Sequence, residues 1–484
     1  MNVLTLSQEK IAEFLTLLAF SEEEKKRLIS FLRKFSNRDD FFIVGGAVRD
    51  FFLGRKILDL DLCVKEGVEA LAFFAKEYLG YNLVPLAPEL GIYRVAKGEN
   101  SLDFTLFRGK TLDEDLGARD FTFNAMAIPV SSLFSESLKV IDPFDGYSHL
   151  ISGKIKIIGE VNVIEDPLRI LRGYRFFAQG IGEIEEETRE IFKLHKKELL
   201  FCAKERILQE LSYILLSDRC YETFKLMDED GILGELFPFF EKTKGVTQPS
   251  FHHLDVWGHL LESLKWAEKI LQNPEDYLGL EKTEDFNKEE VVIPVKLASL
   301  FHDLGKAFTF GRNKERITFY GHEKVSAELF KESFEKYRLK KELLHKTYVL
   351  IKNHMRPFHL LNEKEKGNLT IRAKRHLLTD VPYWLELFVV SMADSYASQG
   401  PDKEPDYEER LKAFFFELKE FKAEMENISQ KKRLITGQDL INLGLKPGPM
   451  FKEILQEIEL LFLEKKIHNK EEALNLIKSK YLNL

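Results

Sequence analysis

Two carboxylates at positions 59 and 61 follow a Gly-Gly turn in the stretch of residues 41–64, FFIVGGAVRDFFLGRKILDLDLCV. The apolar runs 41–44 and 60–64 are typical of short buried strands. Side chains at i and i+2 of a strand share a face, so Asp59 and Asp61 can ligate divalent metal together. Gly45 and Gly46 let backbone amides approach a phosphate, and Arg49 can pair with phosphate oxygens. The stretch predicts a site that holds a triphosphate against metal, although a lone Asp-x-Asp can also be a solvent-facing strand end.

A second polar set lies in EDPLRILRGYR, residues 165–175. Arg169, Arg172 and Arg175 recur every three residues, which places them on one face of a helix, with Asp166 near its N-terminus. An Asp acceptor beside an Arg donor can read the edge of a base by hydrogen bonding, whereas the alternative is a solvated basic stripe. Asp103, in the predicted strand SLDFTLF, is either a third acidic group of the site or a half-buried strand residue.

A third set combines imidazoles and carboxylates within residues 251–400. It consists of His259, His302, Asp303 and Asp394, with His322 and His354 as additional groups. Such a mixed set suits a divalent transition metal, and the two additional histidines would allow a second ion. Two metals could activate water against a phosphoester. The alternative is a helical scaffold that retains these residues without catalysis.

The overall composition limits the class of protein. The 484 residues, 44% hydrophobic, suffice for several domains. A formal net charge of −8 means that any surface for RNA must be local. Three cysteines without metal-type spacing fit a reducing, cytoplasmic compartment. We see no signal peptide and no membrane-spanning run, so we expect no membrane association, and no protein partner is evident.

Several motifs together resemble class II tRNA nucleotidyltransferases and bacterial poly(A) polymerases, members of the polymerase-β-like superfamily. GGAVRD and DLDL are followed, in the family's order, by ARDFTFNAMA, DPFDGYSHL, EDPLRILRGYR, ERILQEL and GQDLINLGLKPGP. The chain departs from the family at Ala118, where an Arg is usual. The stretch around HDLGK, residues 302–306, resembles the HD phosphohydrolase superfamily. The resemblance covers nearly the whole chain after residue 37.

The resemblance implies an α+β fold with a small polymerase-β-like head, formed by a mixed sheet with helices, and an elongated all-α remainder. The expected parts are a helical N-terminal extension (1–36), a nucleotidyltransferase head (37–155), a neck with the nucleotide-selecting helix (156–240), an HD-type body (241–400) and a helical tail (401–484). Within the body, the polar segment 272–291 is expected to be a loop or insertion. In the tail, residues 446–449 cannot continue a helix and form either a rigid turn or a contact to an RNA phosphate.

The resemblance also implies residue roles. Asp59 and Asp61, with Asp103 as a further catalytic candidate, would hold two Mg²⁺ ions. The nucleotide-binding residues would be Gly45, Gly46, Arg49, Arg119, Asp120, Asn124, Asp166, Arg169, Arg172 and Arg175, with Asp166 and Arg169 pairing with the base edge. The HD metal candidates are the six residues of the third set, which would bind Ni²⁺, Mn²⁺ or Co²⁺. The substrates would be CTP, or CTP and ATP, and the 3′ acceptor end of tRNA.

One family feature is missing. Family members that complete the CCA sequence carry a flexible, aromatic and Pro-Gly-rich loop between the strand near residue 103 and the ARDFT motif, and it assists the switch from CTP to ATP. Here FRGKTLDEDLGARDFT runs directly from the strand into a predicted helix. We therefore expect an enzyme that adds only CC, with full CCA addition as the alternative. A poly(A) polymerase is disfavoured by the HD region and the lack of a long basic tail. The intact Asp59/Asp61 and Asp166/Arg169 pairs argue against a protein that is mainly an HD phosphohydrolase, or a scaffold that only binds RNA.

Overall fold

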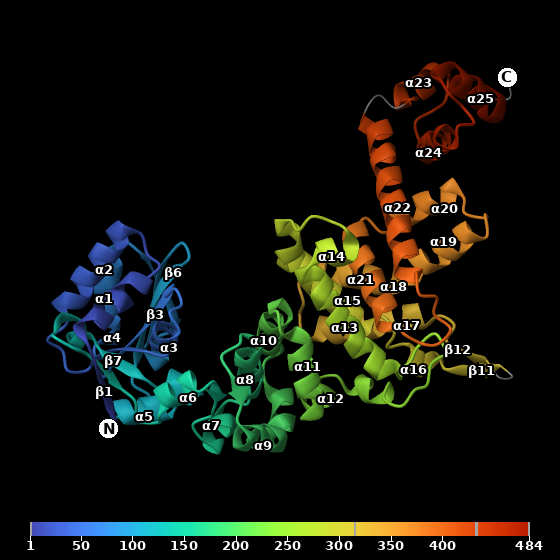
Figure 1. Ribbon diagram of the computed structural model, residues 1–484. Coiled ribbons are helices and arrows are strands. Elements are labelled where there is room, and N and C mark those ends of the chain that lie inside the picture. Colours follow the sequence, from blue (N-terminus) through green and yellow to red (C-terminus); the bar gives the residue numbers. More distant parts are fainter. Residues whose placement is uncertain (1, 314–315, 431–433, 483–484) are drawn as a thin grey trace. The chain divides into compact units, whose positions relative to one another are not determined.

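A computed structural model describes residues 2–313, 316–430 and 434–482, and the chain divides into two compact units, Met1–Leu236 and Phe237–Leu484 (Figure 1). Each unit is described by itself. The first contains a mixed sheet with helices and a following set of helices. The second is almost entirely helical in its described part. The α+β organisation expected from the sequence is thereby confirmed.

Within the described residues, eight strands of the first unit form one mixed sheet in the order β1-β8-β7-β2-β3-β6-β5-β4. Their bounds are β1 Val3–Leu6, β2 Phe41–Val44, β3 Asp59–Val64, β4 Asn82–Ala87, β5 Ile92–Lys97, β6 Asn100–Leu106, β7 Ala127–Pro129 and β8 Leu138–Ile141. All four residues of β2 are buried, as expected for a strand inside a covered sheet. β3 runs parallel to β6 and antiparallel to β2, which places the acidic strand β3 between them.

The helices around and after the sheet are α1 Gln8–Leu17, α2 Glu22–Lys34, α3 Gly46–Phe52, α4 Val68–Leu79, α5 Leu112–Gly117, α6 Gly146–Ile151, α7 Glu160–Glu165, α8 Arg169–Ala178, α9 Glu186–His195, α10 Lys204–Leu216, α11 Cys220–Glu229 and α12 Ile232–Leu236. α2 starts with a capping box in which Ser21 and Glu24 satisfy each other's backbone amides. Two short parallel strands, β9 Lys154–Ile155 and β10 Glu183–Ile184, join the start of the neck to the turn after α8.

The N-terminal segment contains helices α1 and α2, as expected for residues 1–36, but it begins with a strand instead of a helix. Val3–Leu6 form strand β1, which pairs antiparallel with β8 and becomes an edge strand of the sheet. Its burial alternates along the strand, which is typical of an edge with one covered face. Four residues are too few for such alternation to be told from a helix start, so only the pairing with β8 reveals the strand.

The second unit is built from α13 Val256–Gln272, α14 Pro274–Leu278, α15 Glu289–Phe301, α16 Lys306–Thr309, α17 His322–Lys336, α18 Lys341–Asn353, α19 Arg356–Glu365, α20 Ile371–Asp380, α21 Trp384–Ala397, α22 Tyr407–Gln430, α23 Gly437–Asn442, α24 Pro449–Leu463 and α25 Lys470–Tyr481. An antiparallel hairpin of β11 Gly311–Asn313 and β12 Arg316–Thr318 follows α16. Every residue of α15 except its first two is buried, so this helix is a central element of the unit.

Segment 272–291 is more ordered than the loop expected for it. Pro274 stands in the first turn of the short helix α14, and Leu278 and Phe286 are buried. These apolar anchors, spaced within an otherwise polar segment, hold it against the helices. In the tail, residues 446–449 interrupt the helices as expected, because α23 ends at Asn442 and α24 begins at Pro449.

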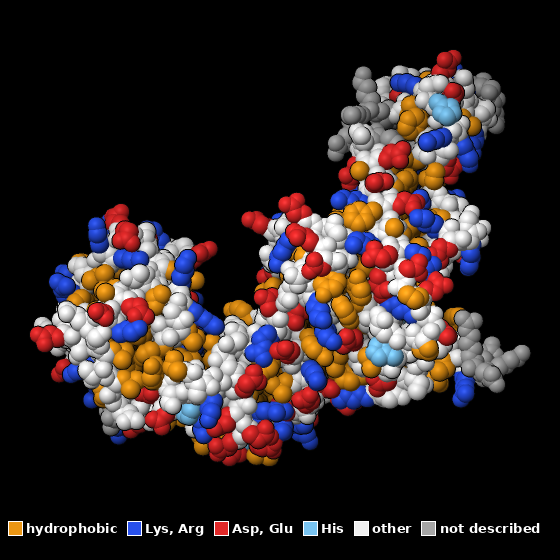
Figure 2. All heavy atoms as spheres, viewed as in Figure 1, with side chains coloured by type: hydrophobic (Ala, Val, Ile, Leu, Met, Phe, Trp, Pro, Cys, Tyr) orange, Lys and Arg blue, Asp and Glu red, His pale blue; other side chains and the backbone are white. Residues whose placement is uncertain are grey.

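Charge is mixed over the surface. On the face in view, Figure 2 shows Lys and Arg side chains interspersed with Asp and Glu in both units, in keeping with the net charge of −8. Among the described residues, no helix is both long and apolar enough to cross a membrane.

Candidate active site

The turn between β2 and α3 is built around Gly45. Its φ of +69° with ψ of −133° is a backbone conformation that residues with a β-carbon rarely adopt. A Cβ at this position would lie 2.7 Å from Oδ2 of Asp61 and 3.1 Å from a guanidinium nitrogen of Arg119. The amide of Gly46, at the start of α3, donates a hydrogen bond to the Asp61 carboxylate. The turn therefore needs glycine at position 45 and brings a backbone amide, a carboxylate and a guanidinium together.

Three carboxylates lie on the two parallel strands beside this turn. Asp59 and Asp61 are on β3, and Asp103 stands opposite Asp61 on β6. Ser101 donates to Asp59 at 2.7 Å, and Arg94 donates two hydrogen bonds to Asp103 at 2.6 and 2.7 Å. Burial raises the pKa of Asp61, and the negative charges of Asp103 and Asp59 add to this effect. A divalent cation would neutralise this repulsion between neighbouring carboxylates, and carboxylate oxygens are the ligands that such a cation prefers.

A chain of hydrogen bonds leads from α3 to α8. Arg49 donates to Oδ1 of Asn124 at 3.0 Å, and Asn124 donates to Oδ1 of Asp120 at 2.9 Å. Arg172 donates to Oδ2 of Asp120 from Nε at 2.8 Å, and its Nη2 lies 2.5 Å from the same oxygen. Burial alone would raise the pKa of Asp120. The charge of Arg172 and the hydrogen bond from Asn124 outweigh this effect and lower the pKa of Asp120 to about 2. Asp120 is thus an ionised anchor between the candidate phosphate-binding Arg49 and the neck.

The two residues expected to read the base are each held by a different partner. Arg169 is buried and donates to the backbone carbonyls of Ala118 at 2.7 Å and Arg119 at 3.0 Å. Asp166 precedes α8 in extended backbone and accepts from Arg206 of α10 at 2.9 and 3.3 Å. The predicted helix face therefore begins at Arg169, and Asp166 lies in the connection just before it.

Arg175 continues the series with yet another partner. Its Nε lies 2.8 Å from a carboxylate oxygen of Glu210 on α10, and its guanidinium lies 4.5 Å from the centre of the Phe176 ring. Helical spacing predicts the three arginines on one face of α8, but each has a different partner. Arg169 binds two backbone carbonyls, Arg172 binds Asp120, and Arg175 pairs with Glu210. They link α8 both to the head and to α10.

The connection from β6 to α5 is a short, hydrogen-bonded turn of residues 107–111. Thr111 caps α5 by accepting from the amide of Glu114. The amide of Arg108 donates to buried Asp115 at 3.0 Å, and the amide of Lys110 donates to Glu114 at 2.7 Å. Two of the turn's amides are therefore bonded to side chains of the helix that follows, which holds the turn against α5.

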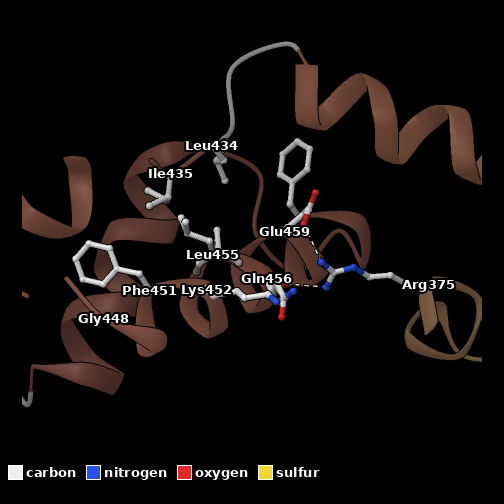
Figure 3. Close-up of a pocket in the computed structure, with 11 residues that line it drawn as sticks. Arg375, Leu434, Ile435, Gly448, Phe451, Lys452, Leu455, Gln456 and Glu459 are labelled. Atoms are coloured by element: carbon white, nitrogen blue, oxygen red, sulfur yellow. Dashed lines mark hydrogen bonds and ion pairs between the residues drawn. The ribbon is translucent and has the colours of Figure 1, made fainter. Parts of the chain in front are cut away.

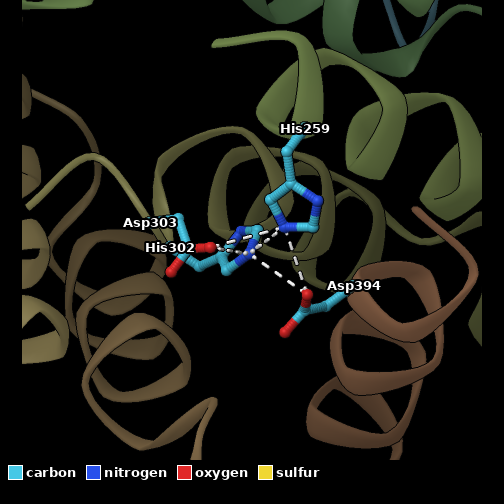
Figure 4. Close-up of side chains that lie close together, drawn as sticks. All are labelled: His259, His302, Asp303 and Asp394. Carbon is cyan, nitrogen blue, oxygen red and sulfur yellow. Dashed lines mark hydrogen bonds and ion pairs between the residues drawn. The ribbon is translucent and has the colours of Figure 1, made fainter. Parts of the chain in front are cut away.

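Four metal-type groups meet in the second unit, as Figure 4 shows. His259 comes from α13, His302 and Asp303 directly follow α15, and Asp394 comes from α21. Nε2 of His259 lies 3.2 Å from Nε2 of His302, 3.4 Å from Oδ2 of Asp303 and 3.2 Å from Oδ1 of Asp394. All four side chains are buried, so these close contacts concentrate ligand atoms around one point.

Asp303 joins this group to a second one. Its other oxygen, Oδ1, lies 3.1 Å from Nε2 of His322 and 3.5 Å from Nε2 of His354. The two histidine nitrogens are 3.4 Å apart. One carboxylate thus faces both groups, each through a different oxygen, which is an arrangement that suits a bridging ligand between two cations.

The histidine rings are oriented by their second nitrogens. Nδ1 of His302, His322 and His354 lies 2.7–2.9 Å from the backbone carbonyl three residues earlier. A carbonyl accepts, so each Nδ1 carries a proton, and with a metal bound each Nε2 would offer its lone pair to the centre. This is the tautomer that a metal ligand needs.

A cavity of about 510 Å³ opens beside these groups, lined among others by His252, Asp303, Lys306, His322 and Tyr407. Nζ of Lys306 is 2.5 Å from Oδ2 of Asp303 and donates to Gln248 at 2.7 Å. Burial acts to raise the pKa of Asp303, but the positive charges of Lys306 and His302 outweigh burial and hold this pKa well below its usual range. The buried candidate ligands therefore have an open space of this volume next to them, large enough for a small molecule.

Four family models match successive parts of the chain. The model of the Poly A polymerase head domain matches residues 41–156, and the model described as the probable RNA and SrmB-binding site of polymerase A matches residues 183–243. The HD domain model matches residues 256–398, and the model of tRNA nucleotidyltransferase domain 2 matches residues 416–477. A CC-adding tRNA nucleotidyltransferase of Thermus thermophilus is 31% identical over 90% of this chain and 92% of that protein. The chain belongs to the tRNA nucleotidyltransferase family. It is a nucleotidyltransferase with an HD domain, as its motifs indicated.

Relatives named for the addition of different nucleotides are about equally similar to this chain in sequence. An A-adding tRNA nucleotidyltransferase of Deinococcus radiodurans is 29% identical over 86% of this chain and 90% of that protein. The solved complex structure of a CCA-adding enzyme with CTP shares the fold, with a TM-score of 0.66 at 22% identity and coverage of 100% and 99% of the two chains. Overall similarity thus identifies the family. It does not distinguish which nucleotides, or how many, the enzyme adds.

Sequence reasoning did not select some groups that the structure adds to the sites. These are Arg94 beside Asp103, Asp115 in the turn after β6, Arg206 beside Asp166, and Lys306 beside Asp303. Arg206 and Lys306 lie inside the motifs ERILQEL and HDLGK, so motif membership was an available signal for these two. The other two have no signal of their own, because only the strand pairing and the turn bring them to their partners.

A further cavity, about 480 Å³ in volume, lies at the tail, where α20 faces α24 (Figure 3). Its wall is mostly apolar, and Arg375 enters it from α20. Arg375 is paired with Glu459 at 2.8 Å and donates to the carbonyl of Gln456 at 2.9 Å. Because this charge is balanced by its neighbours, we assign the cavity to packing of the tail and not to catalysis.

Proposed function

We propose that this enzyme adds two cytidines from CTP to the 3′ end of tRNA, without a nucleic-acid template, and then stops. In each step the terminal 3′ oxygen of the tRNA forms a bond to the α-phosphorus of CTP. The bond from that phosphorus to the bridging oxygen of the β-phosphate breaks, pyrophosphate leaves, and the hydroxyl proton passes to solvent. Full CCA addition is the alternative.

The observation that carries the proposal is the turn of residues 107–111. Two of its amides are bonded to Glu114 and Asp115, and Thr111 caps the helix that starts at residue 112. A switch from cytosine to adenine requires a pocket that changes shape, and this connection offers no extended segment to move. The Thermus relative named as CC-adding is in agreement, whereas the Deinococcus relative is named as A-adding, so the relatives alone do not decide.

The residues of the head would act as follows. Asp59 and Asp61, with Asp103 beside them, have the donor chemistry to hold two Mg²⁺ ions. When bound there, Mg²⁺ supplies Lewis acidity for the attacking hydroxyl and charge neutralisation for the triphosphate. The backbone at Gly46 and the Arg49 guanidinium donate to triphosphate oxygens.

The neck residues would select the base. Cytosine offers an amino donor at N4 and an acceptor at N3, so Asp166 accepts from the first and Arg169 donates to the second. Uracil has the opposite order of donor and acceptor and would be rejected, since it would face a carboxylate with its own carbonyl oxygen. Arg172 and Arg175 hold α8 through Asp120 and Glu210 and contribute positive charge toward the triphosphate.

The test uses a tRNA transcript that ends at its discriminator base, incubated with CTP alone or with CTP and ATP. We expect two added cytidines in both reactions. An added adenosine in the second reaction would refute the CC-only proposal. Asp59→Ala should abolish incorporation, and the matched variant Asp113→Ala, a carboxylate on the first turn of α5 outside the site, should retain it. Equal activity of the two variants would remove Asp59 from the catalytic set.

A second activity, hydrolysis of phosphoesters in the HD domain, is favoured by the position of Asp303 between the two ligand groups. The donor set of imidazoles and carboxylates suits Ni²⁺, Mn²⁺ or Co²⁺ better than Mg²⁺. When bound there, such an ion supplies Lewis acidity for attack by water. Lys306, at the cavity, would contribute a positive charge for a substrate phosphate. Hydrolysis of bis-p-nitrophenyl phosphate with each metal should disappear in Asp303→Ala, and a lack of hydrolysis in the wild type with every metal would favour the scaffold alternative.

A further inference from the structure

A guanidinium stands at the end of the row of carboxylates in the head. Asp61 on β3 is opposite Asp103 on β6, and Asp103 is opposite Arg94 on β5. Residues opposite one another on neighbouring strands project from the same face of a sheet. Asp103 therefore lies between a carboxylate on one side and a guanidinium on the other. Because like charges repel and unlike charges attract, its side chain is drawn toward Arg94 and away from Asp61.

The contact between Asp103 and Arg94 occupies both oxygens of the carboxylate. Nε of Arg94 donates to Oδ1 at 2.7 Å, and Nη2 donates to Oδ2 at 2.6 Å. Such a pair of parallel hydrogen bonds fixes the plane of the carboxylate as well as its position. The side chain of Asp103 is 17% exposed and that of Arg94 is 44% exposed. The guanidinium is therefore the member of the pair that can move out into solvent.

The three head carboxylates are farther apart than the metal-type groups of the HD domain. Among the described residues, the sets of three or four ligand atoms that all lie within 4.8 Å of one another are both in the HD domain, and the head carboxylates form no such set. Mg²⁺ binds oxygen at about 2.1 Å, so two oxygens on one ion are at most about 4.2 Å apart. Asp103 must therefore turn away from Arg94 if it is to share an ion with Asp59 and Asp61.

We propose that Arg94 is an exchangeable counter-ion of Asp103, which keeps this carboxylate out of the metal-binding set until a divalent cation competes for it. In the exchange, Asp103 turns toward Asp59 and Asp61, its two hydrogen bonds from Arg94 break, and one of its oxygens becomes free to bind the cation. The guanidinium keeps its proton and passes into solvent. Arg94 is thus a positioning residue that acts through Asp103. This inference rests on the proposed metal role of the head carboxylates and adds the group that controls the entry of a third ligand.

An arginine that only orients a metal ligand would have the opposite effect on metal affinity. Hydrogen-bond partners behind a ligating carboxylate strengthen metal binding, so their removal weakens it. An exchangeable counter-ion competes with the metal, so removal of Arg94 should free Asp103 and tighten metal binding. The sign of the change in metal affinity therefore separates the two roles.

The experiment measures the affinity of the head for a divalent ion in the full-length enzyme, with Fe²⁺ as the probe. Bound Fe²⁺, with ascorbate and hydrogen peroxide, produces hydroxyl radicals that cut the chain next to the ion. Cuts beside β3 and β6 report on the head, and cuts beside α15 report on the HD domain, so fragment lengths separate the two sites. In Arg94→Gln the Fe²⁺ concentration for half-maximal head cuts should fall about three- to tenfold, the scale of a partly exposed ion pair. Arg94→Lys keeps the charge but loses the planar fork, so its value should lie between those of the wild type and Arg94→Gln. Cuts beside α15 should be unchanged in both variants.

The variant Asp103→Asn shows whether Arg94 acts through Asp103. Added to Asp103→Asn, Arg94→Gln should leave the Fe²⁺ dependence of the head cuts unaltered. A fall by the same factor with and without Asp103 would overturn the inference, because that is the effect of a positive charge acting at a distance.

The matched control is Arg27→Gln. Arg27 has a similarly exposed side chain, 52% against 44% for Arg94, and is paired with a carboxylate, Glu23, at the same distance of 2.6 Å. Its Fe²⁺ dependence should equal that of the wild type. An unchanged or raised Fe²⁺ concentration in Arg94→Gln would overturn the inference and leave the proposed metal role of the head carboxylates intact. A lack of head cuts in the wild type and in Arg94→Gln would overturn both.

Discussion

Replacement of Gly45 by Ala tests the construction of the head most sharply. The residue has φ +69° and ψ −133°, and a Cβ there would lie 2.7 Å from an oxygen of Asp61 and 3.1 Å from a nitrogen of Arg119. The backbone strain costs about 1–3 kcal/mol for a residue with a β-carbon. Displacement of two charged groups adds roughly 1 kcal/mol or more, so we expect local destabilisation of about 2–4 kcal/mol.

Gly46→Ala provides the control within the same turn. A Cβ on Gly46 would meet a nitrogen of Arg49 at 3.5 Å, which is ordinary contact, and φ at this position is not positive. Ala is a good residue for the first turn of α3, so its stability should stay within about 0.5 kcal/mol of the wild type. Hydrogen exchange at the amides of β2 and β3 measures both effects locally. Equal protection in the two variants would show that position 45 accepts a β-carbon as readily as position 46.

Further predictions concern the neck and the HD domain. The native pKa of Asp120 is about 2, below the unfolded value of about 3.9, so its ionised form stabilises the fold above pH ~4 and this contribution is lost as the pH falls toward 2. Asp120→Asn should therefore cost about 2 kcal/mol in urea unfolding at pH 7, less at pH 3, and an equal loss at both pH values would contradict this. In the HD domain, Asp303→Asn should lower bound Mn²⁺ or Ni²⁺ at both ligand groups, whereas Asp394→Asn should spare the group of His322 and His354. Metal content after dialysis measures this, and identical losses in the two variants would argue against a bridging role of Asp303.

Local patterns in the sequence predicted the elements that carry the head site. The run Phe41–Val44 is strand β2 with the expected bounds, and β3 begins one residue before the predicted apolar run, at Asp59. Such short apolar runs, flanked by charged residues or by Gly45 and Gly46, are local patterns, so they can be recognised without tertiary information. Strand Val3–Leu6 has no such signal and exists because β8 offers a partner.

Partners that come from distant parts of the chain could not be predicted. Helical spacing placed Arg169, Arg172 and Arg175 on one face, but their partners lie about 35 to 50 residues away in either direction. Spacing describes the helix that carries a side chain and contains no information on what the side chain meets. The HD groups were predictable as a set from their types, yet the division of labour between the two oxygens of Asp303 is visible only in three dimensions.

The proposed stop after two cytidines distinguishes this enzyme from one that completes CCA. It is tested most directly with a tRNA transcript that already ends in CC, incubated with ATP and Mg²⁺ and without CTP. Because the 107–111 turn is bonded to α5, and because Asp166 and Arg169 are each held by protein partners, we predict no extension of this transcript at an enzyme concentration that completes CC addition to the shorter one. Addition of a single adenosine at a comparable rate would show that the site does not stop after CC.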